Sequence, residues 1–273
     1  MNLLQSIILG TVQGLTEFIP VSSSAHLVLV PYLLGWEIPE NVAFVFDVLV
    51  QVATLIGVIT YFWKDLISII SSMWHGIRAK KPLADFNARL GWLIILASIP
   101  AGLFGILVKD TVEAAFSDPV MTALFLFVTA GLLIIAERAG KRSREISQLT
   151  WWDALWIGLF QAAAIFPGIS RSGATIAGGM THDLERPAAA RFSFLMSVPI
   201  MLAAGFLASL DLFNTPGLSS YLPVFIPGFI VAGVVGYLSI RWLLRYLIRH
   251  PLYIFAIYCI GLGLVTILVT WLR

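Results

Sequence analysis

The sequence predicts an all-α polytopic membrane protein with six transmembrane helices and two re-entrant helical hairpins in an inverted repeat. Three observations support this fold class: an apolar composition, six long apolar stretches, and two similar apolar stretches that polar residues interrupt. Of the 273 residues, 59% are hydrophobic and only 12% are charged, whereas soluble domains carry about 25% charged residues. The net charge of +2 gives no support for a nucleic-acid partner. We therefore expect a chain that is surrounded by membrane lipid.

Six stretches are long enough to cross a bilayer, because a helix needs about 20 mostly apolar residues to span the hydrocarbon core. They are residues 42–62, 89–108, 119–137, 188–209, 221–245 and 251–272. Two further apolar stretches, residues 1–34 and 153–181, are broken near their middles by proline and polar residues. Such breaks are tolerated at membrane depth only where protein or a water-filled cavity surrounds them. We therefore predict two re-entrant hairpins, each entering and leaving the membrane on one side.

Basic residues indicate which loops face the cytoplasm, since cytoplasmic loops carry an excess of lysine and arginine. The loops at 109–118 and 210–220 hold a single basic residue, Lys109. The other connections and the span ends beside them hold Lys64, Arg78, Lys80, Lys81, Arg89, Arg138, Lys141, Arg142, Arg144, Arg186, Arg191, Arg241, Arg245 and Arg249. Six spans then place both termini outside the cytoplasm, so the first hairpin opens outward and the second opens inward.

The two interrupted stretches also resemble each other in sequence. Gly-Thr-Val-Gln at 10–13 matches Gly-Leu-Phe-Gln at 158–161. Proline followed by serines then recurs, as Pro-Val-Ser-Ser at 20–23 and as Pro-Gly-Ile-Ser-Arg-Ser at 167–172, at an offset close to 148 residues. Three spans follow each copy, so a single integral membrane domain, 1–273, divides into repeats 1–138 and 151–272. Because three is odd, the second copy must be inverted. Inverted repeats with broken helices place a ligand site between the breaks.

The polar residues of the two breaks predict an anion site inside the membrane. The first break supplies Gln13, Glu17, Ser22, Ser23, Ser24 and His26, and the second supplies Ser170, Arg171, Ser172 and Thr175. Gln13 and Glu17 share a helix face and form a modest Mg²⁺ site that water and a substrate phosphate would complete. Arg171 offers a planar fork for phosphate oxygens in a turn that opens a helix.

Several interpretations of these residues stay open on the sequence alone. A serine could be a nucleophile if a base lies close, and His26 could take the Ser23 proton or attack phosphorus itself. Charges within a membrane are usually functional, but Glu17 and Arg171 could also form a purely structural ion pair. Asp47 and Gln51, one turn apart, either line the same cavity or make a structural hydrogen bond. These residues do not separate an enzyme from an anion carrier.

Residues 13–26 and 167–175 closely resemble the two signature motifs of bacterial undecaprenyl-diphosphate phosphatases, also called bacitracin resistance proteins. The likeness covers essentially the whole chain, including residues 191–195 at the start of the fourth span. It implies hydrolysis of the terminal phosphate of undecaprenyl diphosphate, which regenerates the carrier lipid for cell-wall synthesis. It also implies a divalent cation, Mg²⁺ or Ca²⁺, and a place in the bacterial cytoplasmic (inner) membrane. Together with the hairpin topology, it predicts an active site that faces the periplasm or the extracellular side.

The resemblance also assigns roles to single residues. Glu17 would bind metal with Gln13 or orient the nucleophile, and Ser23, His26 or water would attack the outer phosphorus. Arg171 would hold the phosphoryl oxygens, while the hydroxyl groups of Ser22, Ser170, Ser172 and Thr175 would bind the substrate. The family's acidic motif begins with Glu or Gln, and the Gln form here makes metal binding by the protein weaker. A carrier or flippase for the lipid phosphate, alone or in addition to hydrolysis, is the alternative function that the inverted repeat suggests. A homodimer is one assembly that the sequence leaves open.

Overall fold

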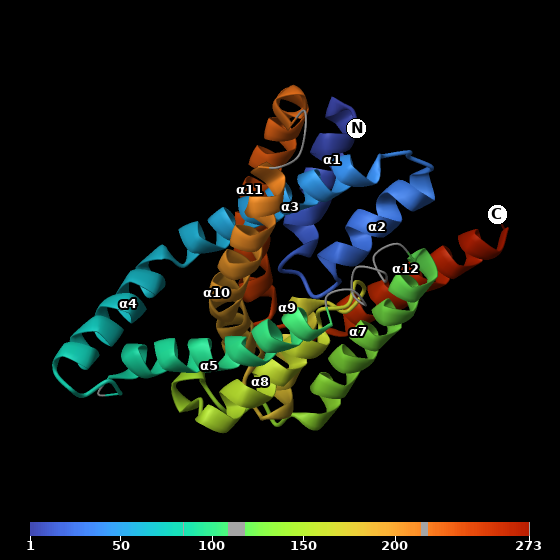
Figure 1. Cartoon of the computed structure of the whole chain (residues 1–273). Helices are drawn as coiled ribbons and strands as arrows, with labels where there is room; N and C mark the ends of the chain where they lie inside the picture. Colours follow the sequence, from blue (N-terminus) through green and yellow to red (C-terminus); the bar gives the residue numbers. More distant parts are fainter. Residues whose placement is uncertain (84, 109–117, 214–217, 273) are drawn as a thin grey trace.

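The computed structural model describes residues 1–83, 85–108, 118–213 and 218–272, and their secondary structure is almost entirely α-helical (Figure 1). The exceptions among named elements are a 3₁₀ turn, η1 (Ile146–Gln148), and an isolated β-bridge between Arg144 and Leu184. The all-α prediction is therefore confirmed.

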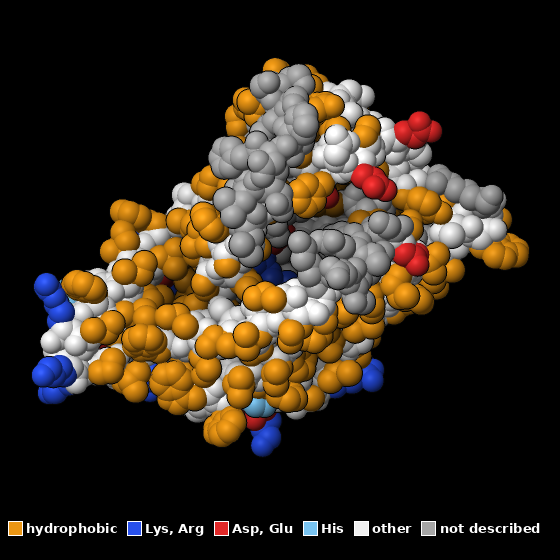
Figure 2. All heavy atoms as spheres, viewed as in Figure 1, with side chains coloured by type: hydrophobic (Ala, Val, Ile, Leu, Met, Phe, Trp, Pro, Cys, Tyr) orange, Lys and Arg blue, Asp and Glu red, His pale blue; other side chains and the backbone are white. Residues whose placement is uncertain are grey.

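Six helices of the described residues are long and apolar enough to cross a membrane, and they coincide with the six predicted spans. They are α3 (Glu40–Tyr61), α5 (Phe86–Leu107), α7 (Pro119–Ala139), α10 (Arg186–Phe213), α11 (Leu218–Tyr246) and α12 (Tyr253–Leu272). The chain is thus a multi-pass membrane protein, as the apolar stretches predicted. On the face in Figure 2, hydrophobic side chains are spread over much of the surface, the protruding lysine and arginine groups lie at the lower and left margins, and the protruding acidic groups lie at the upper right.

Both interrupted stretches are pairs of short helices. The first pair is α1 (Leu3–Thr16) and α2 (Ser23–Leu34), and the second is α8 (Trp151–Ala163) and α9 (Arg171–Thr181). The breaks therefore fall where the polar residues and prolines predicted them. That each pair enters and leaves the membrane on one side, and that the halves form an inverted repeat, stay predictions.

Glycine allows each first helix of a pair to touch a span from the other part of the chain. A Cβ atom on Gly10 of α1 would collide with the carbonyl group of Gly228 in α11. A Cβ atom on Gly158 of α8 would collide in the same way with the backbone of Ala97 in α5. The two glycines that define the sequence repeat are therefore positions of close helix contact. As a result, α1 is locked onto α11, and α8 onto α5.

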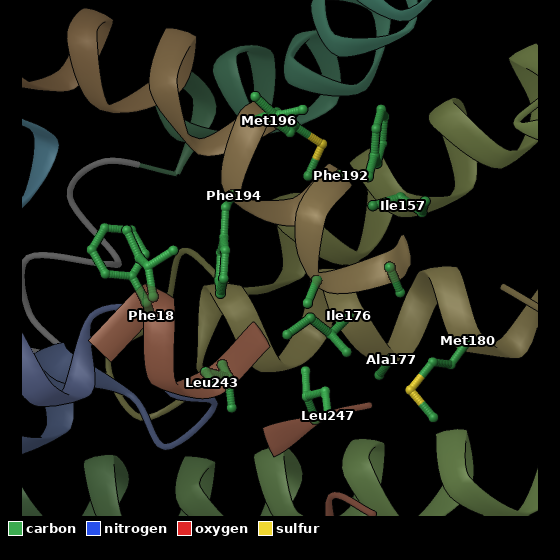
Figure 3. Close-up of a cluster of buried hydrophobic side chains, with 14 of the residues drawn as sticks. Phe18, Ile157, Ile176, Ala177, Met180, Phe192, Phe194, Met196, Leu243 and Leu247 are labelled. Carbon is green, nitrogen blue, oxygen red and sulfur yellow. The ribbon is translucent and has the colours of Figure 1, made fainter. Parts of the chain in front are cut away.

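A buried apolar cluster surrounds α9 and fixes the second break (Figure 3). Ile176 and Met180 of α9 are fully buried, in the same cluster as Leu243 of α11. Phe194 of α10 meets Phe18 of the first break edge to face, with ring centroids 5.4 Å apart. Because these side chains pack at the density of a protein interior, the polar turns beside them are held rigidly.

The helix α4 (Trp63–Arg78) was not predicted, because its residues were interpreted as part of a basic loop. In Figure 1 it projects from the bundle alongside α5. Its exposed apolar side chains recur three or four residues apart, at Trp63, Ile67, Ile70, Trp74 and Ile77. This spacing is typical of an amphipathic helix, and Lys64 and Arg78 at its two ends, with the basic residues that follow, obscured it.

Two buried carboxylates tie the second pair of helices to the loop before it. Asp153 in the first turn of α8 accepts hydrogen bonds from Arg144, Thr150 and His182. Burial raises the pKa of Asp153, but these hydrogen bonds outweigh that effect and hold the pKa below its usual value. Glu137, at the end of α7, accepts from both Arg142 and Arg186. This network fixes the loop before α8 and the connection from α9 to α10.

Candidate active site

Glu17 follows α1 directly and joins the two breaks. Its Oε2 atom accepts hydrogen bonds from Ser23 Oγ at 2.6 Å and from Gln13 Nε2 at 2.9 Å. Its Oε1 atom accepts from Arg171 Nη2 at 2.6 Å. The Glu17 side chain is only 4% exposed, while that of Arg171 is 20% exposed. Among the described residues, no other group accepts a hydrogen bond from the Arg171 guanidinium, so its remaining N–H groups are available to an anion.

Matched serine caps begin the two helices that follow the breaks. Ser22 Oγ accepts from the backbone N–H of Ala25 and lies 3.1 Å from Ser24 Oγ. Ser170 Oγ accepts from the backbone N–H of Gly173 and lies 3.1 Å from Ser172 Oγ. Each contact recurs at an offset of 148 residues. The helix N-termini that these serines cap are favourable places for an anion, because their N–H groups and dipoles attract negative charge.

The second break is held in place by α7. Thr129 Oγ1 donates to the carbonyl oxygen of Gly168 at 2.8 Å and accepts from the backbone N–H of Ser170 at 2.9 Å. Gly168 adopts a φ of 103°, which a residue with a side chain rarely takes. Ser172 Oγ then donates to the carbonyl oxygen of Ile19 at 3.3 Å, which links the second break to the first. Thr129 was not predicted as a site residue, since it lies in an otherwise apolar span.

The structure does not bring His26 to the Ser23 hydroxyl. The Nδ1 atom of His26 lies 2.7 Å from the carbonyl oxygen of Ser22, and its Nε2 atom lies 2.7 Å from Tyr258 Oη. Both ring nitrogens are thus engaged, and the contact of Ser23 is with Glu17 instead. Tyr258 gave no signal in the sequence, because it lies in α12, 232 residues from His26.

Thr175 lines neither of the two cavities at Glu17 that are described below. Its hydroxyl group lies 2.6 Å from Ser193 Oγ of α10 and donates to the carbonyl oxygen of Arg171. It is 1% exposed. Its contacts join α9 to α10 and support the turn that carries Arg171.

Two cavities meet at Glu17. The smaller, of about 190 Å³, lies between the breaks and is lined by polar residues of both, together with apolar residues of α10. The larger, of about 730 Å³, is bounded by α1, α2 and α3, and most of its lining is apolar. The residues common to both are Glu17, Ser23, Ser24 and Gln51. Asp47 lines the larger cavity beside Gln51, as one of the two open interpretations predicted. A cavity with both polar and apolar walls therefore adjoins a larger, mostly apolar one at Glu17.

Known proteins match this chain along nearly its full length. The sequence profile of the family described as Bacitracin resistance protein BacA matches residues 6–265. The chain belongs to the BacA family. Curated relatives named undecaprenyl-diphosphatase include one from Thermomicrobium roseum, 42% identical over 98% of both chains. Others come from Desulforudis audaxviator, 41% identical, and Moorella thermoacetica, 42% identical, each aligned over 100% of both chains. Membership of the BacA family confirms the resemblance that the two motifs predicted.

In this BacA-family chain, the donor set available to a divalent cation is small. Glu17 supplies a carboxylate, and Gln13 supplies Oε1, a buried oxygen without a hydrogen-bond partner among the described residues. Within the same residues, no group of three or more His, Cys, Asp and Glu side chains is placed to hold a metal. One carboxylate and one orphan amide oxygen fit a cation whose other ligands are water and substrate phosphate oxygens.

Proposed function

We propose that this chain hydrolyses the terminal phosphate of undecaprenyl diphosphate and releases undecaprenyl phosphate and inorganic phosphate. The observation that carries the proposal is the contact of Glu17 with both Ser23 and Arg171. It places a hydroxyl group, its proton acceptor and a guanidinium group together at the edge of the polar cavity. Phosphoryl transfer depends mainly on such positioning and on neutralising charge. The names of the full-length relatives give the same activity.

The geometry favours Ser23 as the group that attacks the terminal phosphorus. Its hydroxyl already donates to Glu17 Oε2 at 2.6 Å, so the carboxylate accepts the proton as the Oγ–P bond forms. The bond from phosphorus to the bridging oxygen breaks, and undecaprenyl phosphate leaves. Water then attacks the phosphorus of the phosphoserine, and the Ser23 Oγ–P bond breaks. Glu17 returns its proton to Ser23 Oγ, while the proton that the water gives up passes to solvent and inorganic phosphate leaves. Arg171 holds the phosphoryl oxygens throughout, because its free N–H groups face the same cavity.

The two cavities provide for the two parts of the substrate. The diphosphate group occupies the smaller cavity, near the capped N-termini of α2 and α9, where Ser22 and Ser170 line the wall. The isoprenoid chain leaves through the larger cavity, whose wall includes Leu27, Phe44 and Val48. Since a prenyl chain is longer than this cavity, it continues between helices into the bilayer.

A divalent cation, Mg²⁺ or Ca²⁺, held by Glu17 and Gln13 would neutralise charge on the diphosphate oxygens. The basic loops support a site that opens to the periplasmic or extracellular side of the bacterial cytoplasmic membrane. In that location the product serves cell-wall synthesis, and an abundant enzyme protects against antibiotics that sequester the diphosphate lipid. A homodimer stays an assembly that the sequence leaves open.

The test is phosphate release from undecaprenyl diphosphate by the purified protein in detergent, with Mg²⁺ and with chelator. The wild type is compared with Glu17→Gln, Arg171→Ala and the matched surface control Glu37→Gln. We expect turnover that the chelator abolishes, that both site variants lose while they stay folded, and that the control retains. Absence of release from a folded wild type supplied with lipid would overturn the proposal. Transport of the lipid phosphate across proteoliposomes, the alternative function, would then be measured.

A further inference from the structure

The contact between His26 and Tyr258 defines the protonation pattern of the histidine ring. His26 Nδ1 lies 2.7 Å from the carbonyl oxygen of Ser22, and a carbonyl oxygen only accepts hydrogen bonds. Nδ1 therefore carries a proton. In the neutral imidazole, Nε2 is then the acceptor, and the Tyr258 hydroxyl group at 2.7 Å is its donor. The two rings are nearly parallel, with an interplanar angle of 4°.

The Nδ1–H group supports an unusual backbone conformation at Ser22. This residue has a φ of 71° and a ψ of 98°, in the region that residues with a side chain rarely adopt. Such a conformation persists only when its surroundings hold it. The carbonyl group of Ser22 accepts both the His26 ring N–H and the His26 backbone N–H. The next residue is Ser23, so the direction of the Ser22 carbonyl determines where the Ser23 hydroxyl group points.

We propose that Tyr258 is a positioning residue for the proposed reaction, which acts through the His26 ring on the backbone of Ser22. The Tyr258 hydroxyl group fixes the Nδ1–H tautomer of His26, and the ring then holds the turn that presents Ser23 to Glu17. His26 is accordingly a clamp on the backbone and not the base that deprotonates Ser23. This inference rests on the proposed phosphatase activity for its catalytic part and on the contacts alone for its structural part.

A second contact shows that α12 braces α2 at more than one point. Tyr32 Oη donates to Thr270 Oγ1 at 3.0 Å, about two turns from His26 along α2. Only the contact at Tyr258 reaches the residue that clamps Ser22. Thr270→Val therefore weakens the same helix pair without touching the site, which makes it a matched control for Tyr258→Phe.

The histidine variants distinguish a clamp from a base. Asparagine places an amide N–H close to where Nδ1–H lies, whereas glutamine places its amide near Nε2, and neither amide is a base. If His26 clamps Ser22, the kcat of His26→Asn is at least about ten times that of His26→Gln. Only the glutamine variant loses the hydrogen bond to the Ser22 carbonyl oxygen, and one such bond corresponds to about this factor. Tyr258→Phe lowers kcat about three- to tenfold with little change in KM, while Thr270→Val leaves kcat unchanged. Equal loss in both His26 variants, or full kcat in Tyr258→Phe, would overturn the catalytic part.

Nuclear magnetic resonance of the ¹⁵N-histidine-labelled protein tests the contact without any activity. The His26 signals are identified by their absence in His26→Asn, since the chain has four histidines. We expect Nδ1 to carry the proton and Nε2 to move toward the shift of an unbonded nitrogen in Tyr258→Phe. A proton on Nε2 alone, or no movement in that variant, would overturn the inference even if the phosphatase activity is established. If the wild type lacks phosphatase activity, this measurement still decides the structural part.

Discussion

Glu17 and Arg171 lie 154 residues apart in the chain, yet Glu17 Oε1 and Arg171 Nη2 are 2.6 Å apart. Glu17 follows α1, and Arg171 is the first residue of α9. Neither pair of broken helices therefore holds both members of this ion pair. The contact is largely buried on the side of the acid, where desolvation makes a broken pair costly. Its geometry is the basis of the first prediction.

Arg171→Lys lowers kcat/KM by about 100-fold or more, because one ammonium group cannot replace a fork that reaches a carboxylate and a phosphate together. Steady-state phosphate release measures the effect. Arg191→Lys is the control, since the Arg191–Asp65 pair is exposed, and we expect it to stay within twofold of the wild type. A lysine variant with nearly full activity would show that the fork is dispensable.

Ser23→Ala abolishes turnover, whereas Ser24→Ala reduces it less than about tenfold, as expected for loss of one neutral hydrogen bond. Only Ser23 of this pair contacts Glu17. Acid quenching with substrate labelled in the terminal phosphate traps label on the wild-type protein and not on Ser23→Ala. Turnover without any trapped label would indicate direct attack by water.

Gln13→Glu lowers the Mg²⁺ concentration that gives half-maximal activity by several-fold, because a second carboxylate strengthens the site. Gln13→Leu raises that concentration, since the orphan Oε1 oxygen is lost. Titration of Mn²⁺ followed by electron paramagnetic resonance gives the affinities independently of turnover. Identical affinities in the three proteins would exclude Gln13 as a ligand.

Asp153→Asn destabilises the protein by on the order of 2 kcal/mol near neutral pH, since it removes the buried carboxylate that accepts from Arg144, Thr150 and His182. The pKa of Asp153 is lowered by Arg144, Thr150 and His182, so its contribution is present above the ordinary value of about 3.9 and is lost as the pH falls below it. Thermal unfolding of both proteins should therefore give a constant difference from pH 8 to pH 5, roughly the range above that pKa. The difference should narrow only below about pH 4. A difference that narrows already near pH 6 would contradict the assignment.

Gly10→Ala destabilises the chain by about 1–3 kcal/mol, the usual cost of forcing extra atoms into a packed contact. The added methyl group meets the carbonyl group of Gly228, which is backbone and cannot move aside easily. Gly131→Ala is the control, because a Cβ atom there meets nothing within 4 Å, and alanine favours helix. Thermal unfolding in detergent measures the stability of both variants. Equal melting temperatures would contradict the prediction, since they would show that α1 and α11 accommodate the methyl group without loss of stability.

The sequence predicted the spans well because their signal is local: a run of about 20 apolar residues is typical of a helix that crosses a membrane. The breaks were equally clear, since proline, arginine and glutamate stand out in an apolar stretch. The helix α4 was missed because Lys64, Arg78 and the lysines that follow it were interpreted as a basic loop, although the apolar residues of α4 follow a helical period. Local composition therefore predicted the strongly apolar spans correctly. It failed at α4, where polar and apolar residues are interspersed.

At the site, sequence identified which residues meet but not how they pair. The motifs contained Glu17, Ser23 and Arg171, whose mutual contacts agree with a shared site. The interpretation of His26 depended on its spacing from Ser23, and that spacing does not determine the direction of the ring. Tyr258 and Thr129 could not be inferred, because their hydroxyl groups lie in apolar spans and reach the breaks only through the tertiary fold.

The glycine contacts of α1 with α11 and of α8 with α5 have a consequence for biogenesis. During synthesis, α1 emerges more than 200 residues before its partner Gly228. The α1–α11 contact can therefore form only after most of the polypeptide has been synthesised. Truncated products of the first 138 residues lack that partner and should be recognised by membrane proteases. The order of translation, and not only the final packing, thus constrains how such a chain can be made.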